Sequence, residues 1–281
     1  MTRGRGFTLV EMVVSLGLTF IVIAALHRLV TRTQQLSRVQ VAQLSLQSNV
    51  RTGVLVSGNE LRGLSTLPGG AADQNDILSM TPNGVVYRAT RGIGFLCQPP
   101  TGGQLRIARS SYSGWRDPQA LRDMVYLLHE GNPVAGVPDT WIPLGITAVT
   151  TSLSCPGAIG PGITLTTSAV TGPPEATAGT PVRILELMEL KTYQSEGQWW
   201  LGLRSVSSAE AIQPLVGPVD GADGFRLSYL NSDGTPSSDP NAIAGIGIKL
   251  RGVNEELRYS RAAAAVEELT NLVTLHNGGH P

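Results

Sequence analysis

One apolar segment near the N-terminus constrains this chain more than any other feature. Phe7 to Leu26 is a run of 20 residues in which Glu11 is the sole ionisable side chain. As an α-helix the run would be about 30 Å long, which matches the hydrocarbon core of a bilayer. A carboxylate in such a segment is costly to bury in lipid, so it requires a partner or a function. The run therefore predicts one membrane-spanning helix with a functional acid near its start.

The charges around this segment favour an orientation with the N-terminus inside and the C-terminus outside. Arg3 and Arg5 precede the run and would stay in the cytoplasm, although further positive residues after Leu26 make the asymmetry small. A secretory signal peptide is the alternative, since it also has a positive start and an apolar core. Ala24-Ala25 is a poor cleavage site because the helical pattern continues past it. We therefore expect a membrane anchor rather than a cleaved signal.

The six residues Gly6-Phe7-Thr8-Leu9-Val10-Glu11, followed by an apolar helix, closely resemble the class III leader of type IV pilins and type II secretion pseudopilins. The resemblance implies that residues 1–6 are a leader, that a prepilin peptidase cuts between Gly6 and Phe7, and that the new amine of Phe7 is N-methylated. It also implies that Glu11 engages the N-terminal amine of a neighbouring pilin or pseudopilin subunit during assembly.

Physical chemistry supports this role for Glu11 independently. A cut before Phe7 creates a cationic amine at the membrane, and Glu11 lies four residues further along, on the same helical face. Each charge offsets the desolvation of the other if they meet. Pairing between chains would set their axial register, whereas the alternatives are pairing within one chain or an acid that snorkels to the interface.

The helical pattern continues beyond the membrane segment. Apolar residues recur at intervals of three, four or seven, at Leu29, Leu36, Val39, Leu46, Val50, Val54 and Leu61. No proline occurs before Pro68, where Pro68-Gly69-Gly70 ends the pattern. We expect one helix from about Phe7 to Leu64, with a transmembrane or filament-core part over 7–30 and an amphipathic continuation over 31–67 that packs on a domain. A free coiled coil is the alternative for the second part. Many major pilins have a proline in this helix, so its absence favours a minor subunit.

Residues 68–281 are predicted to form a β-rich globular domain, so the fold class is α+β with antiparallel strands. Candidate strands are rich in Val, Ile, Leu, Thr and aromatic residues and are separated by Gly, Pro, Asn and Asp. They are Ile77–Thr81, Val85–Thr90, Gln104–Ala108, Met124–His129, Ile142–Val149, Val182–Tyr193, Trp199–Val206, Phe225–Leu230, Ile243–Leu250 and Leu269–Leu275. The stretches Gly157–Thr180 and Ser232–Asn241 are predicted to be loops.

The second half of the chain carries a more diffuse resemblance. Val182–Tyr193, Gln198–Arg204, Pro214-Leu215-Val216 and Asp223–Tyr229 follow one another in an order that resembles PilW-like minor pilins and J-type pseudopilins. The closing residues Leu269–Asn277 resemble the terminal strand of PilW-like chains. This likeness implies a pilin-like globular domain.

Cys97 and Cys155 both lie in the part of the chain that we expect to be exported. An oxidising periplasm or cell surface would allow a disulfide between them, and two separately buried thiols are the alternative. The bond would close a loop of about 58 residues and contribute on the order of 4 kcal/mol in the chain-entropy model.

No pattern in the sequence indicates an enzyme, a cofactor or a metal centre. The four histidines have no metal-ligand spacing, and there is no Gly-x-Ser-x-Gly motif. Glu186 and Glu189 would lie on opposite faces of a strand, a poor geometry for acid–base catalysis. Two Asp/Asn-Gly segments could offer oxygens to calcium, but such segments usually form turns; they are Asp220–Gly224 and Asn231–Gly234.

The charge balance gives no general attraction for nucleic acid, because 21 basic residues match 21 acidic ones. A local basic strip remains an alternative to scattered solvated arginines at Arg88, Arg91, Arg106 and Arg109.

Taken with the resemblance, these features predict a structural minor pilin, held in the inner membrane, processed, and added near the tip of a type IV pilus. A minor pseudopilin of a type II secretion system, in a periplasmic pseudopilus, is the first alternative. A secreted binding domain with a conventional signal peptide is the second.

Overall fold

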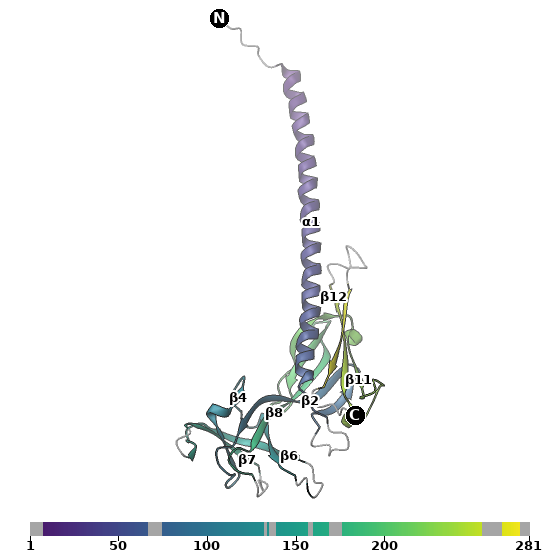
Figure 1. Ribbon diagram of the computed structural model, residues 1–281. Helices are drawn as coiled ribbons and strands as arrows, with labels where there is room; N and C mark the ends of the chain where they lie inside the picture. The colour runs from purple at the N-terminus through teal and green to yellow at the C-terminus, as the bar shows by residue number, and fades with distance from the viewer. Residues whose placement is uncertain are drawn as a thin grey trace.

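The computed structural model describes residues 8–66, 75–131, 134, 139–156, 160–168, 176–254 and 266–275. The α-helix α1 (Leu9–Arg62, 54 residues) projects from a β-rich part formed by the described residues that follow it (Figure 1). At 1.5 Å per residue the helix is about 80 Å long. Thr8 caps its N-terminus, since the Thr8 Oγ1 accepts the backbone N–H of Glu11 at 3.3 Å. The observed bounds lie two residues inside those predicted at each end.

The buried residues of α1 all lie in its C-terminal part. They form a stripe at helical spacing, namely Leu46, Val50, Gly53, Val54, Ser57, Gly58 and Leu61. Because this stripe packs on strands, the second part of the helix is a domain helix, and the alternative of a free coiled coil is wrong for it. From Leu9 to Ser45, by contrast, no residue of the helix is fully buried.

All strand pairings in the described residues are antiparallel, so the α+β class predicted from the sequence is confirmed. The main path through the sheet runs β11-β12-β10-β9-β8-β5-β6-β7-β3, with β1, β2, β4 and β13 attached beside it. The strands are β1 (Ile77–Thr81), β2 (Gly84–Phe95), β3 (Gln104–Ala108), β4 (Ser113–Gly114), β5 (Asp123–His129), β6 (Thr140–Thr150), β7 (Gly162–Thr167), β8 (Pro181–Ser195), β9 (Gln198–Ser205), β10 (Gln213–Val219), β11 (Phe225–Leu230), β12 (Gly245–Val253) and β13 (Val266–Thr274).

The strands form two lobes, each with its own apolar core. We call them the helix-proximal lobe and the distal lobe. The helix-proximal core joins the buried stripe of α1 to apolar side chains of β1, β2 and β8 to β13. The distal core is built from β3 and β5 to β8, together with Leu96, which directly follows β2, and Ala176. In Figure 1 the distal strands β4, β6 and β7 lie to one side, away from α1.

Strand β8 is the element shared by both lobes. Its first half contributes Val182 and Ile184 to the distal core, and its second half contributes Met188 and Leu190 to the helix-proximal core. β2 pairs with β8 along nearly its whole length, with one bulge between Thr90 and Gly92. The bulge leaves Arg91 outside the regular ladder at the point where the strand passes from one lobe to the other.

A two-residue turn at Glu196-Gly197 joins β8 to β9 and fixes their register from Ser195 opposite Gln198 onward. Both turn residues have positive φ, 50° and 78°. This conformation matches the twist of the flanking strands and is readily adopted by glycine.

Most candidate strands lie where the sequence placed them, and three have the predicted bounds (β1, β3 and β11). The prediction of a loop over Gly157–Thr180 was wrong in part, because β7 (Gly162–Thr167) lies within it. β10 (Gln213–Val219) was also missing from the candidate strands, since Pro214 and Pro218 interrupt its pattern.

Candidate functional site

The predicted cleavage position, Gly6 and Phe7, lies outside the described residues. Glu11 lies in the first turn of α1, where the positive end of the helix dipole stabilises a carboxylate. Its side chain has no ion-pair partner within the described part of the chain, and the residues around it are exposed and apolar. The structure therefore leaves the Glu11 carboxylate available to a partner from outside this part of the chain.

The N-terminal part of α1 is an exposed apolar surface. Its hydropathy averages 2.4 over the most apolar 18-residue window, and none of that window is buried. A helix of this length and composition can cross a membrane, and the absence of burial distinguishes it from the core helix of a soluble protein. A signal sequence near the N-terminus also meets these criteria of length and composition.

The C-terminal part of α1 approaches the strands closely because two of its contact residues are glycines. A Cβ at Gly53 would lie 2.6 Å from Leu250 Cδ2 and 2.7 Å from Val216 Cγ1, closer than side chains pack. A Cβ at Gly58 would lie 3.3 Å from Asn271 Nδ2. The missing side chains allow the helix backbone to approach β10 and β12 at Gly53 and β13 at Gly58.

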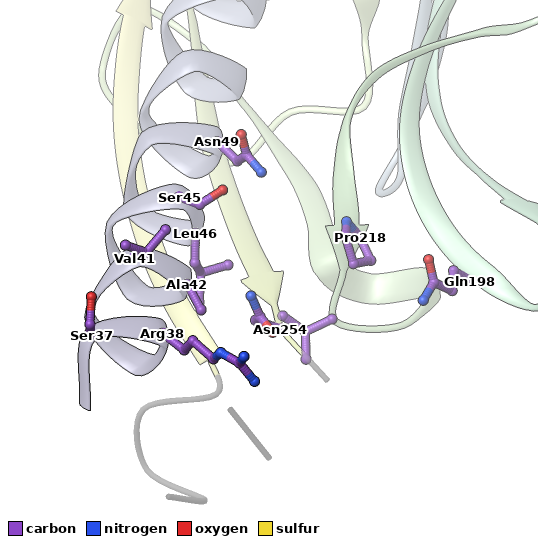
Figure 2. A pocket seen from close by; sticks show the side chains of 11 residues that line it. Ser37, Arg38, Val41, Ala42, Ser45, Leu46, Asn49, Gln198, Pro218 and Asn254 are labelled. Carbon is purple, nitrogen blue, oxygen red and sulfur yellow. The ribbon is translucent and has the colours of Figure 1, made fainter. Parts of the chain in front are cut away.

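A cleft of about 590 Å³ lies between α1 and the ends of β9, β10 and β12. Figure 2 shows the side chains of the helix on one side of it, with Pro218 and Gln198 on the other. Arg38 is the one charged residue of its lining, and the rest are small, polar or aliphatic: Ser37, Val41, Ala42, Ser45, Leu46, Asn49, Gln198, Pro218, Val253 and Asn254. This lining offers neither a nucleophile with a base nor a set of metal ligands.

A cluster of charged residues joins the end of α1 to both lobes. Glu60, in the last two turns of the helix, contacts Arg91 at 3.4 Å and accepts the hydroxyl of Tyr87 at 3.1 Å. Arg91 in turn donates from Nε to Glu186 of β8 at 2.8 Å. Two more arginines converge on the same carboxylate: Arg116, which also binds Asp123 through two contacts of 2.6 Å, and Arg122, which also binds Glu210.

Glu186 is the centre of this cluster and is almost completely buried, at 1% exposure. Burial alone would raise its pKa, but hydrogen bonds from Ser205, Arg91 and Arg122 outweigh burial and hold the pKa below the usual value. The residue therefore stays ionised and serves as a structural anion. Sequence reasoning missed this cluster because its members are up to 150 residues apart, from Glu60 to Glu210.

The remaining candidate residues do not combine into a site. Glu189 binds Lys191 and Arg204 on the opposite face of β8 from Glu186. Asp220 pairs with Arg251, and Asp233 caps a turn by accepting the N–H of Thr235. Within the described ranges no three His, Cys, Asp or Glu side chains are placed to hold a metal ion.

The four arginines considered as a basic strip have separate local roles. Arg88 lies over the ring of Tyr126 and donates to the carbonyl of Asn75, and Arg106 donates to Thr164 and Gln98. Arg109 pairs with Asp117, and Arg91 belongs to the cluster around Glu186. They are dispersed among these contacts, as the alternative of scattered solvated arginines expects. They are not all solvated, however, because Arg91 is buried.

Cys97 and Cys155 are joined by a disulfide in the distal lobe, 58 residues apart in sequence. Both are buried, and together with Ala108 they form a small apolar cluster of their own. The bond links the segment after β2 to the segment after β6. These segments lie beside β3 and β7, which form the end of the strand path opposite to β11 and β12.

Comparison with known proteins gives no relative: no family model, no characterised protein and no solved structure matches this chain. Its function therefore has to be inferred from its own residues and geometry.

Proposed function

We propose that this chain is a minor subunit of a type IV pilus or of the related type II secretion pseudopilus, assembled through its processed N-terminus. The chain performs no catalysis in this role. Its work is to hold a β-domain at the surface or tip of a filament whose core is made of apolar helices.

The observation that carries the proposal is the uncovered apolar half of α1 together with Glu11. Large side chains such as Leu9, Phe20 and Leu29 are each more than 60% exposed. A contiguous apolar surface of this length is unfavourable in water and marks a contact with a membrane or another protein. A bilayer would cover them before assembly, and the helices of neighbouring subunits would cover them afterwards. The same surface thus serves as membrane anchor and as filament core.

Glu11 supplies specificity to an otherwise uniform apolar surface. In lipid or in a helix bundle an unpaired carboxylate is unfavourable, so a subunit gains free energy when the carboxylate meets the terminal amine of Phe7 on another chain. This pairing selects one axial offset between subunits, which van der Waals contacts between aliphatic side chains do not do.

N-terminal sequencing and mass spectrometry of the chain isolated from its own cells test the first half of the proposal. A mature protein that begins at N-methylated Phe7 is expected. A protein that begins after Leu26 would instead support a secreted domain, and an intact leader of residues 1–6 would exclude processing.

Substitution Glu11→Ala tests the second half. Cleavage should proceed normally, because the amine partner arises only afterwards, while the amount of the subunit in sheared filaments should fall at least about tenfold. Ser15→Ala, one turn further along the same helix, is the matched control and should assemble normally. Equal assembly of Glu11→Ala and wild type would show that the pairing is dispensable.

The genes beside this one separate the two assemblies. A retraction ATPase is expected beside a pilus subunit, and a secretin with further pseudopilins beside a secretion subunit.

A further inference from the structure

Strand β13 leaves one edge of the sheet open. It pairs with β12 through nine consecutive residues without a register shift, from Val253 opposite Val266 to Gly245 opposite Thr274. No strand in the described part of the chain pairs with its other side. Nine residues make an edge about 30 Å long.

The register identifies the backbone groups on this edge. The carbonyl of Arg251 in β12 accepts the N–H of Asp220, on the side away from β13. Because successive residues of a strand direct their hydrogen bonds to opposite sides, the even-numbered residues of β12 face β13. Their partners in β13 are odd-numbered. The N–H and C=O groups of Glu268, Thr270 and Leu272 are therefore directed away from the sheet.

This edge lacks the features that usually block strand addition. The sequence of β13 contains no proline and no lysine, and the strand has no bulge. Glu268 is the one charged residue whose backbone faces outward, and its carboxylate is bound by Lys249 at 2.9 Å and Arg251 at 3.4 Å. The rest of the edge, Thr270 to Thr274, is uncharged.

A hollow of about 470 Å³ lies between the first half of β13 and α1. Two exposed leucines line it, Leu44 of the helix and Leu269 of the strand, together with Gln47, Ser48, Val50, Arg51 and Glu267. A strand added beside β13 would direct every second side chain toward this hollow. The site thus combines backbone hydrogen bonding with a place for apolar side chains.

The direction of β13 argues against a second copy as the occupant. Glu267 and Leu269 lie near residues 44–51 of α1, whereas Asn271 and Val273 lie near Gly58, so strand and helix run the same way. Antiparallel pairing of two β13 strands would point the two helices in opposite directions. Two chains anchored with the same orientation in one membrane cannot adopt that arrangement.

We propose that the β13 edge binds an extended segment of a different subunit of the same assembly, which adds a strand to the sheet and places apolar side chains against Leu44 and Leu269. The inference rests on the proposed function, because the exposed apolar surface of α1 that brings subunits together adjoins this hollow at Leu44. The β13 edge would determine which subunit binds beside this one, and Glu11 would determine the axial offset between the two subunits.

The first test places the photoreactive residue p-benzoylphenylalanine at Thr270 of the full chain in its own cells. Ser228 is the control position. It is exposed on β11, a strand whose outer side is already occupied, because the backbone N–H of Leu227 donates to the carbonyl of Pro82. A heteromeric adduct at Thr270 and none at Ser228 is expected, with the crosslinked residues lying in an extended segment of another pilin-type subunit. An adduct between two copies of this chain, or no adduct, would overturn the proposal.

Two substitutions at Thr270 then test the hydrogen-bonding mode. Thr270→Pro removes an outward N–H and leaves the β12 ladder intact, while Thr270→Val keeps the N–H and a similar shape. Thr270→Pro should reduce the heteromer at least about tenfold and Thr270→Val should not. Equal loss or equal retention in both variants contradicts strand addition.

Amide hydrogen exchange of the wild-type chain gives a readout that needs no variant. The amides of Thr270 and Leu272 should exchange at least about tenfold more slowly in the assembly than in detergent-solubilised monomer. Unchanged exchange in filaments that contain the chain overturns the edge proposal and leaves the proposed function standing. A mature chain that does not begin at Phe7 removes the proposed function itself, whatever the state of the edge.

Discussion

Helix α1 carries two acidic residues, one near each end, and their surroundings differ in almost every respect. Glu11 lies in the first turn, where the helix dipole favours it, yet no described residue pairs with it. Glu60 lies near the C-terminus, where the dipole disfavours an acid, and Arg91 and Tyr87 contact its carboxylate. Among the described residues, the acid at the C-terminal end of the helix thus has partners and the acid at the N-terminal end has none.

The same contrast extends to the apolar residues of the two halves. Leu61 is completely buried against the strands, whereas Leu16 is 62% exposed. One continuous helix therefore has two kinds of surface, one buried in a folded core and one exposed and apolar, which in the proposed function meets lipid or other subunits. A substitution should act on folding in one half and on membrane or filament contacts in the other.

The largest expected effect comes from Gly53→Leu. The new side chain would collide with Leu250 and Val216 and force the helix away from the sheet, so we expect a loss of about 4 kcal/mol in the free energy of unfolding. Urea unfolding in detergent micelles measures this through tryptophan fluorescence, since all four tryptophans lie outside α1. Gly17→Leu is the control, because nothing lies within 4 Å of its Cβ position. A similar loss in both variants would remove the contrast.

Leu61→Ala should have the next largest effect. Truncation of this fully buried side chain leaves a cavity and should lower the free energy of unfolding by about 3 kcal/mol. Leu16→Ala should leave the unfolding of the β-domain unchanged in the same measurement. If Leu16→Ala lowers domain stability, the two halves of the helix are not independent.

Glu60→Gln sharpens the comparison of the two acids. Its loss of charge weakens the contacts with Arg91 and Tyr87 and should cost about 1 kcal/mol of domain stability, with filament assembly unchanged. Glu11→Ala is expected to show the opposite pattern, with intact stability and reduced assembly. Unfolding curves and sheared-filament yields for both variants distinguish the two roles.

The smallest effect concerns pH. The pKa of Glu186 is lower in the folded chain than its usual value of 4.5, so its ionised form favours folding. This contribution is complete above about pH 5 and is lost as pH falls through the lowered pKa. Glu186→Gln has no such titration, and its unfolding free energy should fall less steeply between pH 5 and pH 3. Parallel curves for wild type and variant would show that Glu186 does not contribute.

Local patterns were sufficient to predict the helix and most of the strands. The interval pattern from Leu29 to Leu61 gave the helix, because 3.6-residue periodicity is typical of one. It gave the buried face only from Leu46 onward, since Leu29 and Leu36 are exposed. Phe225–Leu230 alternates in burial, as its sequence indicates. β7 was missed because it is embedded in a stretch rich in glycine and proline, where turn signals hide a six-residue strand.

The charged cluster could not be predicted, because it depends on which strands become neighbours. Glu186 stands in an alternating sequence that predicts a half-exposed strand. In the structure β5 and β2 flank this part of β8. Three arginines converge on the carboxylate, one from β2 and two from the connection between β4 and β5. The open edge of β13 has the same origin, since only the pairing of the whole sheet defines which strand is last.

The shared strand β8 has a mechanical consequence. Its hydrogen-bonded ladder with β2 passes without a flexible linker from the disulfide-bonded end of the molecule to the strands beneath α1. A pulling force on the distal lobe would therefore load many backbone hydrogen bonds of this ladder in shear at the same time. The paired strands β2 and β8 would transmit the force to the strands that pack on α1.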